Sequence, residues 1–497
     1  MEAAWIVNVK TSVVLGSLFL VLLFSPYLII AFETGSVDLK LTSSDLYVLW
    51  FTILQAFLSS MLSIALGVLG ALSLLKCKNQ YPNLNRTLLR PLCLLPNIVP
   101  VLLVLLASLQ MINPFPFGLF GIVLIHGIIN IGIVSLSLEK IIRNKLSGLS
   151  EIAELLGEKS KFRFLKIGLG VIRSDLILLF MFVFAICYSS FAVPLVVGGS
   201  QATTIEVLIY EEIRISGNWS KALSLSILQS IVLFVLCFSI PFVFVKERIH
   251  FRKCRLLHSW VGLPMNIVPG VIIVLGLILS LPMGWMQLKR VPSLQEELGG
   301  LFLNSMFVGI GTGVLTLSLL LLLAFLYLKG LQRRIALSYV APSTVICGFA
   351  LLFLGNQSET WSLYRIVLGL TLISVPALFR LSFAGKLYGI ESQREVGESL
   401  GGTSSQVFKW IVLPQVFSNA CFLSGIAAFW AWGDFALSNV VSDRALTLSL
   451  VIQQLMGSYR LELATLLVWI VIFGGMLSFF LFSGLGYVYD KKIVSKF

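Results

Sequence analysis

Runs of about twenty apolar residues recur along this 497-residue chain, and they decide what it can fold into. Hydrophobic residues make up 58% of the sequence and charged residues only 12%, whereas a soluble domain carries about a quarter. No alternating ten-residue pattern of a membrane β-barrel occurs. Because backbone polar groups must be satisfied within lipid, the spans are expected to be helices. The chain is therefore predicted to be an all-α integral membrane protein.

The apolar runs predict twelve transmembrane helices. The predicted spans at 92–112 and 337–355 contain prolines, and the span at 224–245 also contains Pro241. The predicted spans are 12–32, 48–74, 92–112, 117–138, 175–197, 224–245, 261–281, 300–327, 337–355, 363–383, 418–440 and 463–485.

The positions of lysine and arginine predict the orientation. If Met1 lies in the cytoplasm, most of the 36 Lys and Arg residues fall on the inner side, as the positive-inside rule requires. Both termini are then cytoplasmic, and the first apolar run is read as an uncleaved span. The net charge of +13 is explained by this bias toward an anionic inner leaflet and requires no nucleic acid.

One polar pattern occurs twice. It reads E-x-[AG]-x-x-x-G, then nine residues, then I-x-L, and it begins at Glu151 and again at Glu395, 244 residues later. At the same offset, Phe191 aligns with Phe435 and Thr203 with Thr447. The chain is therefore predicted to be two six-span halves, 1–245 and 261–497, joined by a cytoplasmic linker at 246–260. An even number of spans makes the repeats parallel.

Each copy of the pattern is expected to form a short cytoplasmic helix. In the second copy, Ser392 to Glu395 resembles a capping box, and the pair Gly401–Gly402 would end the helix. In the first copy, the helix is expected to start at Ser150 and stop at Gly157. The stretch after the second copy can lie along the membrane surface.

At these residues the chain resembles the permease subunits of bacterial binding-protein-dependent ABC importers, whose signature loop reads E-A-A-x-x-x-G-x9-I-x-L-P. The resemblance covers both halves and implies the type I permease fold. It also implies coupling loops near 150–170 and 392–414 that bind ATPase subunits. The residues that match are Glu151, Ala153, Gly157, Ile167 and Leu169 in the first copy and Glu395, Gly397, Gly401, Ile411, Leu413 and Pro414 in the second. Gly170 replaces the motif proline in the first copy.

The fusion of two halves resembles the iron(III)/thiamine branch of these importers. The stretches 198–210 and 447–460 look most like thiamine permease subunits, although iron permeases carry related versions. The resemblance implies two copies of a cytoplasmic ATPase subunit and an external solute-binding protein as partners. It also implies location in the bacterial inner membrane, where the halves would alternate between inward and outward access.

The sequence gives little support for an enzyme or for a metal-binding protein. The only Gly-Lys pair, Gly385–Lys386, is followed by Leu387, so there is no Walker A phosphate loop and no cofactor is expected. The three histidines and seven cysteines show no ligand spacing, which gives no metal site.

A secondary transporter remains a more distant alternative, because twelve spans in two parallel repeats also describe that class. Ion-coupled carriers usually need ionisable groups inside the membrane, and this chain has few. Asp434 is the main acid within a predicted span. It is expected toward the outer mouth of the pathway, where it either contacts a cationic cargo or serves as a helix-end hydrogen-bond acceptor.

Overall fold

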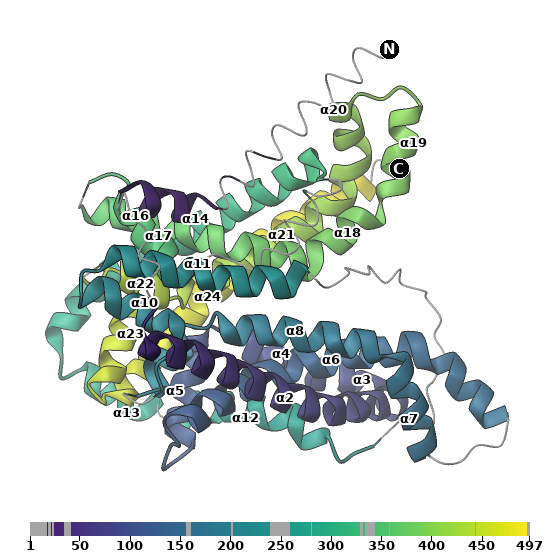
Figure 1. Cartoon of the computed structure of the whole chain (residues 1–497), viewed down its shortest axis with the longest axis horizontal. Helices are drawn as coiled ribbons and strands as arrows, with labels where there is room; N and C mark the ends of the chain where they lie inside the picture. Colours follow the sequence, from purple (N-terminus) through teal and green to yellow (C-terminus); the bar gives the residue numbers. More distant parts are fainter. Residues whose placement is uncertain are drawn as a thin grey trace. The chain divides into compact units, whose positions relative to one another are not determined.

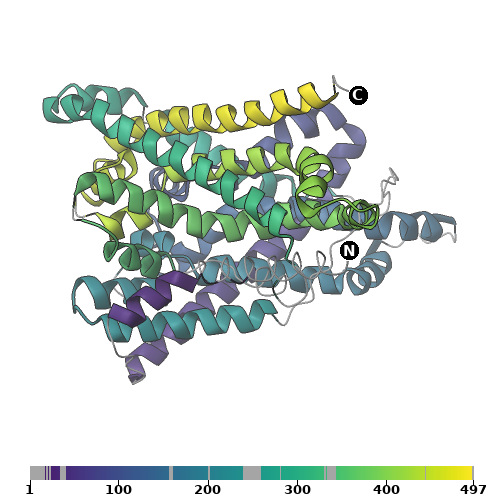
Figure 2. The same cartoon turned by 90° about the horizontal axis from the view of Figure 1, so that it is seen from above.

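The chain is described by a computed structural model, shown in Figures 1 and 2. The residues that it describes are 17, 21, 24–33, 41–155, 161–199, 202–238, 259–279, 281–328, 332, 343–356, 358–442 and 444–494. All regular structure within these ranges is helical, and the chain is a multi-pass membrane protein. It divides into two compact units, each built from separate stretches of sequence.

The first compact unit in chain order comprises 42–207 and 245–282. A capping box starts its first long helix, because Thr42 and Asp45 exchange side-chain and backbone hydrogen bonds. Its helices are α2 (Ser43–Gln80), α3 (Pro82–Leu84), η1 (Asn85–Leu89), α4 (Arg90–Ile98), α5 (Val101–Met111), α6 (Leu119–Leu155), α7 (Lys161–Val171), α8 (Arg173–Tyr188), α9 (Ala192–Val197) and α12 (Leu263–Leu279). The helix α10 (Ile205–Arg214) begins here and continues into the other unit.

The other unit contains 208–244 and 283–497 together with the N-terminal segment. In it α21 packs against both α14 and α24, and Figure 2 shows α24 as one long yellow helix. Its helices are Phe24–Glu33, α11 (Trp219–Phe238), α13 (Leu281–Leu288), α14 (Pro292–Leu326), α16 (Thr344–Leu352), α17 (Glu359–Leu378), η2 (Phe379–Phe383), α18 (Ala384–Gly389), α19 (Glu391–Ser399), α20 (Ser404–Val407), η3 (Phe408–Val412), α21 (Leu413–Trp432), α22 (Ala436–Val441), α23 (Leu448–Gly457) and α24 (Leu461–Val494).

Eight helices in the described ranges are long and apolar enough to cross a membrane, or nine if one bent pair counts as a single span. The eight correspond to the predicted spans at 48–74, 117–138, 224–245, 261–281, 300–327, 363–383, 418–440 and 463–485. The bent pair joins α3–α4 to α5 at 105° and replaces the straight span predicted at 92–112. The bend falls at Val99, which is extended because Pro100 follows it.

Two predicted spans are wrong as continuous helices. The one at 175–197 stops at Tyr188 and resumes as α9, and the one at 418–440 stops at Trp432 and resumes as α22. The two breaks lie 244 residues apart, so the same order of helices occurs in both halves of the sequence. The spans predicted at 12–32 and 337–355 are described only in part, as the helices Phe24–Glu33 and α16.

The compact units do not follow the halves of the sequence. The helix α12 lies beyond the predicted linker, yet it packs in the unit formed mainly by the first half. There the Asn266 amide donates to the Gly70 carbonyl at 2.9 Å and to the Ser73 hydroxyl at 2.8 Å. Conversely, Trp219 of α11 packs edge-on against Phe349 of α16 in the other unit. The boundaries 1–245, 246–260 and 261–497 remain a prediction about the repeat.

Close packing of α4 against α6 depends on Gly132. A Cβ at this position would lie 1.8 Å from the backbone oxygen of Cys93, which cannot move aside cheaply. We expect Gly132→Ala to lower the free energy of unfolding by about 1–3 kcal/mol, the usual cost of overpacking. Thermal unfolding of the purified protein in detergent measures it. The matched control is Gly299→Ala on α14, where no atom of the described residues lies within 4 Å, and equal losses in both variants would contradict the steric explanation.

Candidate functional site: the second coupling loop

The second coupling loop, residues 392–414, is built around the nine-residue helix α19. Figure 1 shows α18, α19 and α20 in green, gathered at one end of their unit. The helix ends as predicted, because Gly401 adopts φ +87° and its amide donates to the Glu398 carbonyl. The predicted start is wrong: α19 begins at Glu391 without a side-chain cap, and Ser392 is already inside it. The capping box of this loop lies at Thr403 and Gln406 instead.

Arg394 attaches α19 to the end of α14. The arginine is only 6% exposed, and its Nη1 donates to the Ala324 carbonyl at 3.3 Å. Its guanidinium also lies 4.3 Å from the centre of the Tyr327 ring. A cation at the carbonyl end of a helix is stabilised by the helix dipole, and the ring adds a cation–π contact. The Glu398 carboxylate accepts from Arg394 Nε at 3.0 Å, so both sides of the guanidinium are held.

Two glycines allow the rest of the loop to pack against α19. A Cβ at Gly397 would lie 2.5 Å from the Ile411 Cδ1 atom, so these two motif residues are in direct contact. A Cβ at Gly402 would lie 2.8 Å from the Gly397 carbonyl oxygen. Gly401, by contrast, has open space around it and is needed for its backbone conformation. Gly397 and Gly402 therefore allow close packing, whereas Gly401 allows the backbone conformation of the turn.

The remaining motif residues connect the loop to α21. Pro414 lies in the first turn of α21, where no backbone donor is required. Val412, between Ile411 and Leu413, is fully buried in the core that includes the end of α14. Gln415 of α21 donates to Gln393 of α19 at 2.6 Å. Movement of α19 would thus be transmitted directly to α14 and α21.

The outer surface of α19 is apolar at two positions one turn apart. Val396 is 57% exposed and Leu400 is 82% exposed, and we call this pair the apolar tip. Glu395 beside it is also exposed. An exposed apolar pair on a helix that is otherwise polar is typical of a contact surface for another protein.

The first coupling loop is built differently. The helix α6 runs without interruption through Ser150, which is buried, to Leu155, so the predicted helix start at Ser150 is wrong. Glu151 and Ala153 thus belong to the last turns of α6, and Gly157 lies outside the described residues. The other two motif residues, Ile167 and Leu169, are exposed on α7.

Packing of α7 onto α6 uses Gly168, where a Cβ would lie 3.0 Å from a Leu146 methyl. Gly170, at the position of the motif proline, is exposed, and a Cβ added there would have no neighbouring atom within 4 Å among the described residues. The replacement of proline by glycine therefore disturbs no described contact.

Asp434 lies between α21 and α22, at the second of the two helix breaks. Its carboxylate accepts from the backbone amides of Leu437 at 3.1 Å and Ser438 at 3.4 Å. The geometry is that of a helix-end acceptor. Contact with cargo, the alternative left open by the sequence, stays a prediction.

Within the described ranges, no group of three or more His, Cys, Asp or Glu side chains is placed to hold a metal ion.

A hollow of about 440 Å³ lies in the loop between α10 and α11, which the orientation prediction places outside. It is lined by Glu33, Gly217, Asn218, Trp219, Ser220 and Phe353. The rings of Trp219 and Phe353 are 5.2 Å apart and form its aromatic wall.

Known proteins with related sequences share one description. The chain is 29% identical over 261 residues to the thiamine transport system permease protein ThiP of Escherichia coli (strain K12), covering 48% of this chain and 47% of that protein. It is 30% identical over 203 residues to ThiP of Salmonella typhimurium, covering 37% of each. The ThiP protein of Brucella abortus (strain 2308) is 28% identical over 224 residues, or 41% of each.

The chain is similar to thiamine permease proteins. This agrees with the resemblance carried by the two coupling loops. The chain spans about half or less of the length of the curated relatives that it matches. No family model matches it, and no solved structure does.

Proposed function

We propose that this chain is the membrane-spanning permease subunit of an ABC importer that moves a small solute across the bacterial inner membrane. The observation that carries the proposal is the second coupling loop: a short helix with an exposed apolar tip, fixed by Arg394 to the end of one long helix and continuous with another. In this arrangement, movement of α19 by a bound ATPase subunit would also move the two spans α14 and α21. The similarity to thiamine permease proteins supports the same conclusion.

In this mechanism the chain itself does no covalent chemistry. Two cytoplasmic ATPase subunits bind the coupling loops, and an external binding protein delivers cargo near residues 198–223 and 441–462. Closure of the ATPases moves α19, and the two halves switch between inward and outward access. Coupling requires the ATPases to bind the two permease states with different affinity. Both termini lie in the cytoplasm.

For the cargo we propose thiamine or its phosphates, on the basis of the named relatives. The test is reconstitution of the chain in liposomes with its ATPase and binding protein, followed by uptake of labelled thiamine. Uptake that requires both partners and ATP is expected. Uptake of iron(III) instead would change the cargo but keep the importer, whereas uptake driven by an ion gradient without the ATPase would refute the proposal.

A further inference from the structure

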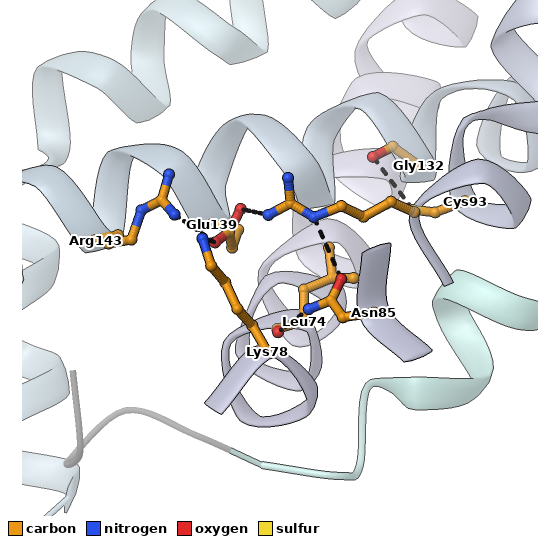
Figure 3. A network of polar contacts seen from close by, with 8 residues as sticks. Leu74, Lys78, Asn85, Cys93, Gly132, Glu139 and Arg143 are labelled. Carbon is orange, nitrogen blue, oxygen red and sulfur yellow. Dashed lines mark hydrogen bonds and ion pairs between the residues drawn. The ribbon is translucent and has the colours of Figure 1, made fainter. Parts of the chain in front are cut away.

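A basic cluster surrounds one buried carboxylate in the unit that contains α2, α4 and α6. Figure 3 shows the side chains converging on Glu139, which is only 2% exposed. Arg90 Nη2 donates to its Oε2 at 2.7 Å, while Lys78 Nζ and Arg143 Nη1 lie 3.5 and 3.7 Å from Oε1. We call Lys78, Arg90 and Arg143 the basic cluster. Three cations thus share one anion.

Neighbouring residues fix the position of Arg90 within the cluster. Asn85 accepts from Arg90 Nε at 3.3 Å and donates to the Leu74 carbonyl at 3.0 Å. Arg90 is also the first residue of α4, whose position against α6 is fixed by the close approach of Cys93 to Gly132. The guanidinium of Arg90 is therefore oriented by contacts from two neighbouring elements.

Within the described part of the chain, the charge of the cluster is not balanced. Glu139 neutralises one of the three cations and is the only acid in the stretches 74–93 and 119–146. The three basic side chains remain 27–35% exposed, so their remaining donors can reach a group outside the protein. The Oε1 atom of Glu139 has no hydrogen-bond partner among the residues that the structure describes, because its two neighbouring cations are too distant. Two positive charges are thus left to meet an external anion.

The side chains around the cluster are of the types that gather in the headgroup region of a membrane. Tyr81 and Trp260 pack with ring centres 6.4 Å apart, and Lys76 lies 4.9 Å from the Trp260 ring. Tyrosine and tryptophan gather where the hydrocarbon core meets water. Leu84 and Leu88 beside them are exposed and apolar, as expected for side chains that face acyl chains. An anion at this place therefore has lipid on one side and water on the other.

We propose that the basic cluster binds the phosphate of an anionic phospholipid. The surplus of two positive charges favours a headgroup with net negative charge over a zwitterionic one, and the neighbouring leucines suit its acyl chains. The position 244 residues after Glu139 is Phe383, which is fully buried in an apolar core. The site consequently belongs to one half of the repeat only, and it does not depend on which cargo the protein carries.

The test measures lipid affinity of the full chain in nanodiscs of phosphatidylcholine, with and without phosphatidylglycerol, by native mass spectrometry. The variant carries Lys78→Gln and Arg143→Gln and keeps Arg90, so that Glu139 retains its shortest ion pair. Each basic residue near a membrane surface contributes about fivefold in affinity for anionic lipid. We expect the double variant to bind phosphatidylglycerol roughly 20-fold more weakly, with phosphatidylcholine binding unchanged. The single variant Arg143→Gln, which removes the longest contact, should bind phosphatidylglycerol about fivefold more weakly than the parent chain.

The matched control is Lys145→Gln, also on α6. Lys145 is paired one-to-one with Asp175, at 2.7 and 2.9 Å from its two oxygens, so it leaves no surplus charge. Its loss should leave phosphatidylglycerol affinity within about twofold of the parent. Equal affinity of the parent chain for both lipids, or no change in either cluster variant, would overturn the proposal. Displacement of phosphatidylglycerol by inorganic phosphate at equal concentration would show a free-anion site and would also overturn it.

Discussion

Replacing both residues of the apolar tip with aspartate, Val396→Asp and Leu400→Asp, is expected to reduce ATP-dependent uptake at least about tenfold. The two side chains are among the most exposed apolar groups of α19, and charges there would have to be desolvated in any interface with the ATPase. Neither side chain supports the fold of the loop, so the melting temperature should not change. Pull-down of the ATPase by the purified chain and uptake into proteoliposomes measure the two effects separately.

The control for this prediction places the same charge on the same helix. Ser392→Asp together with Ser399→Asp adds two carboxylates at exposed polar positions of α19 and leaves the apolar tip intact. Uptake in this variant should stay within about twofold of the parent. If both double variants lose uptake equally, charge on α19 is the cause and the tip is not a contact surface. If neither loses uptake, the coupling function of α19 is refuted.

The second large effect is expected from Arg394→Met, which keeps an unbranched apolar stem but removes the guanidinium and its charge. The variant loses the hydrogen bond to the Ala324 carbonyl and the contact with the Tyr327 ring. A hydrogen bond to a charged group contributes about 1.5–3 kcal/mol. Because the loss is local, α19 should open more often while the rest of the fold remains stable. Hydrogen exchange of the amides of Leu400, Gly401 and Gly402 should accelerate by roughly 10- to 100-fold.

Function should change in a characteristic way in this variant. The apolar tip remains, so the ATPase still binds, but its movement is transmitted poorly to α14 and α21. We expect ATP hydrolysis with strongly reduced uptake. Lys289→Met is the control, because Lys289 is exposed and lies outside the stretches assigned to the binding protein, and its contact with the Trp285 ring at 6.0 Å contributes little. Unchanged exchange and uptake in Arg394→Met would contradict the attachment of α19 through this residue.

The sequence predicted the parts of the site that depend on neighbouring residues. Gly401 as the helix end follows from glycine's tolerance of positive φ. The contact between Gly397 and Ile411 was not predicted, although both residues belong to the repeated motif. Arg394 was missed as a structural residue, because its partners Ala324 and Tyr327 lie about seventy positions earlier in the chain. Its one local signal is the pairing with Glu398 four residues later.

The errors in the helices have a related origin. Apolar composition predicts where a helix can cross a membrane but not where it is interrupted. The breaks after Tyr188 and Trp432 fall at short pairs, Ser189–Ser190 and Gly433–Asp434, inside longer apolar runs. At the second break the new helix is started by the Asp434 carboxylate, which a hydropathy pattern registers only as one polar residue. Similarly, nothing in the first copy of the motif indicates that α6 continues through Ser150, because that depends on its burial against the rest of the unit.

The contribution of α12 to the earlier unit has a consequence for biogenesis. Chains are inserted as they are synthesised, and the N-terminal part normally folds first. Here the Ser73 hydroxyl already donates to the Gly70 carbonyl, but the Asn266 amide that binds both groups is synthesised almost two hundred residues later. A nascent chain released before α12 lacks the helix that packs against α2, α4, α5 and α6, so the faces of these helices that α12 covers remain exposed. Ribosome stalling or truncation anywhere before residue 263 should therefore yield a product that membrane proteases recognise and degrade.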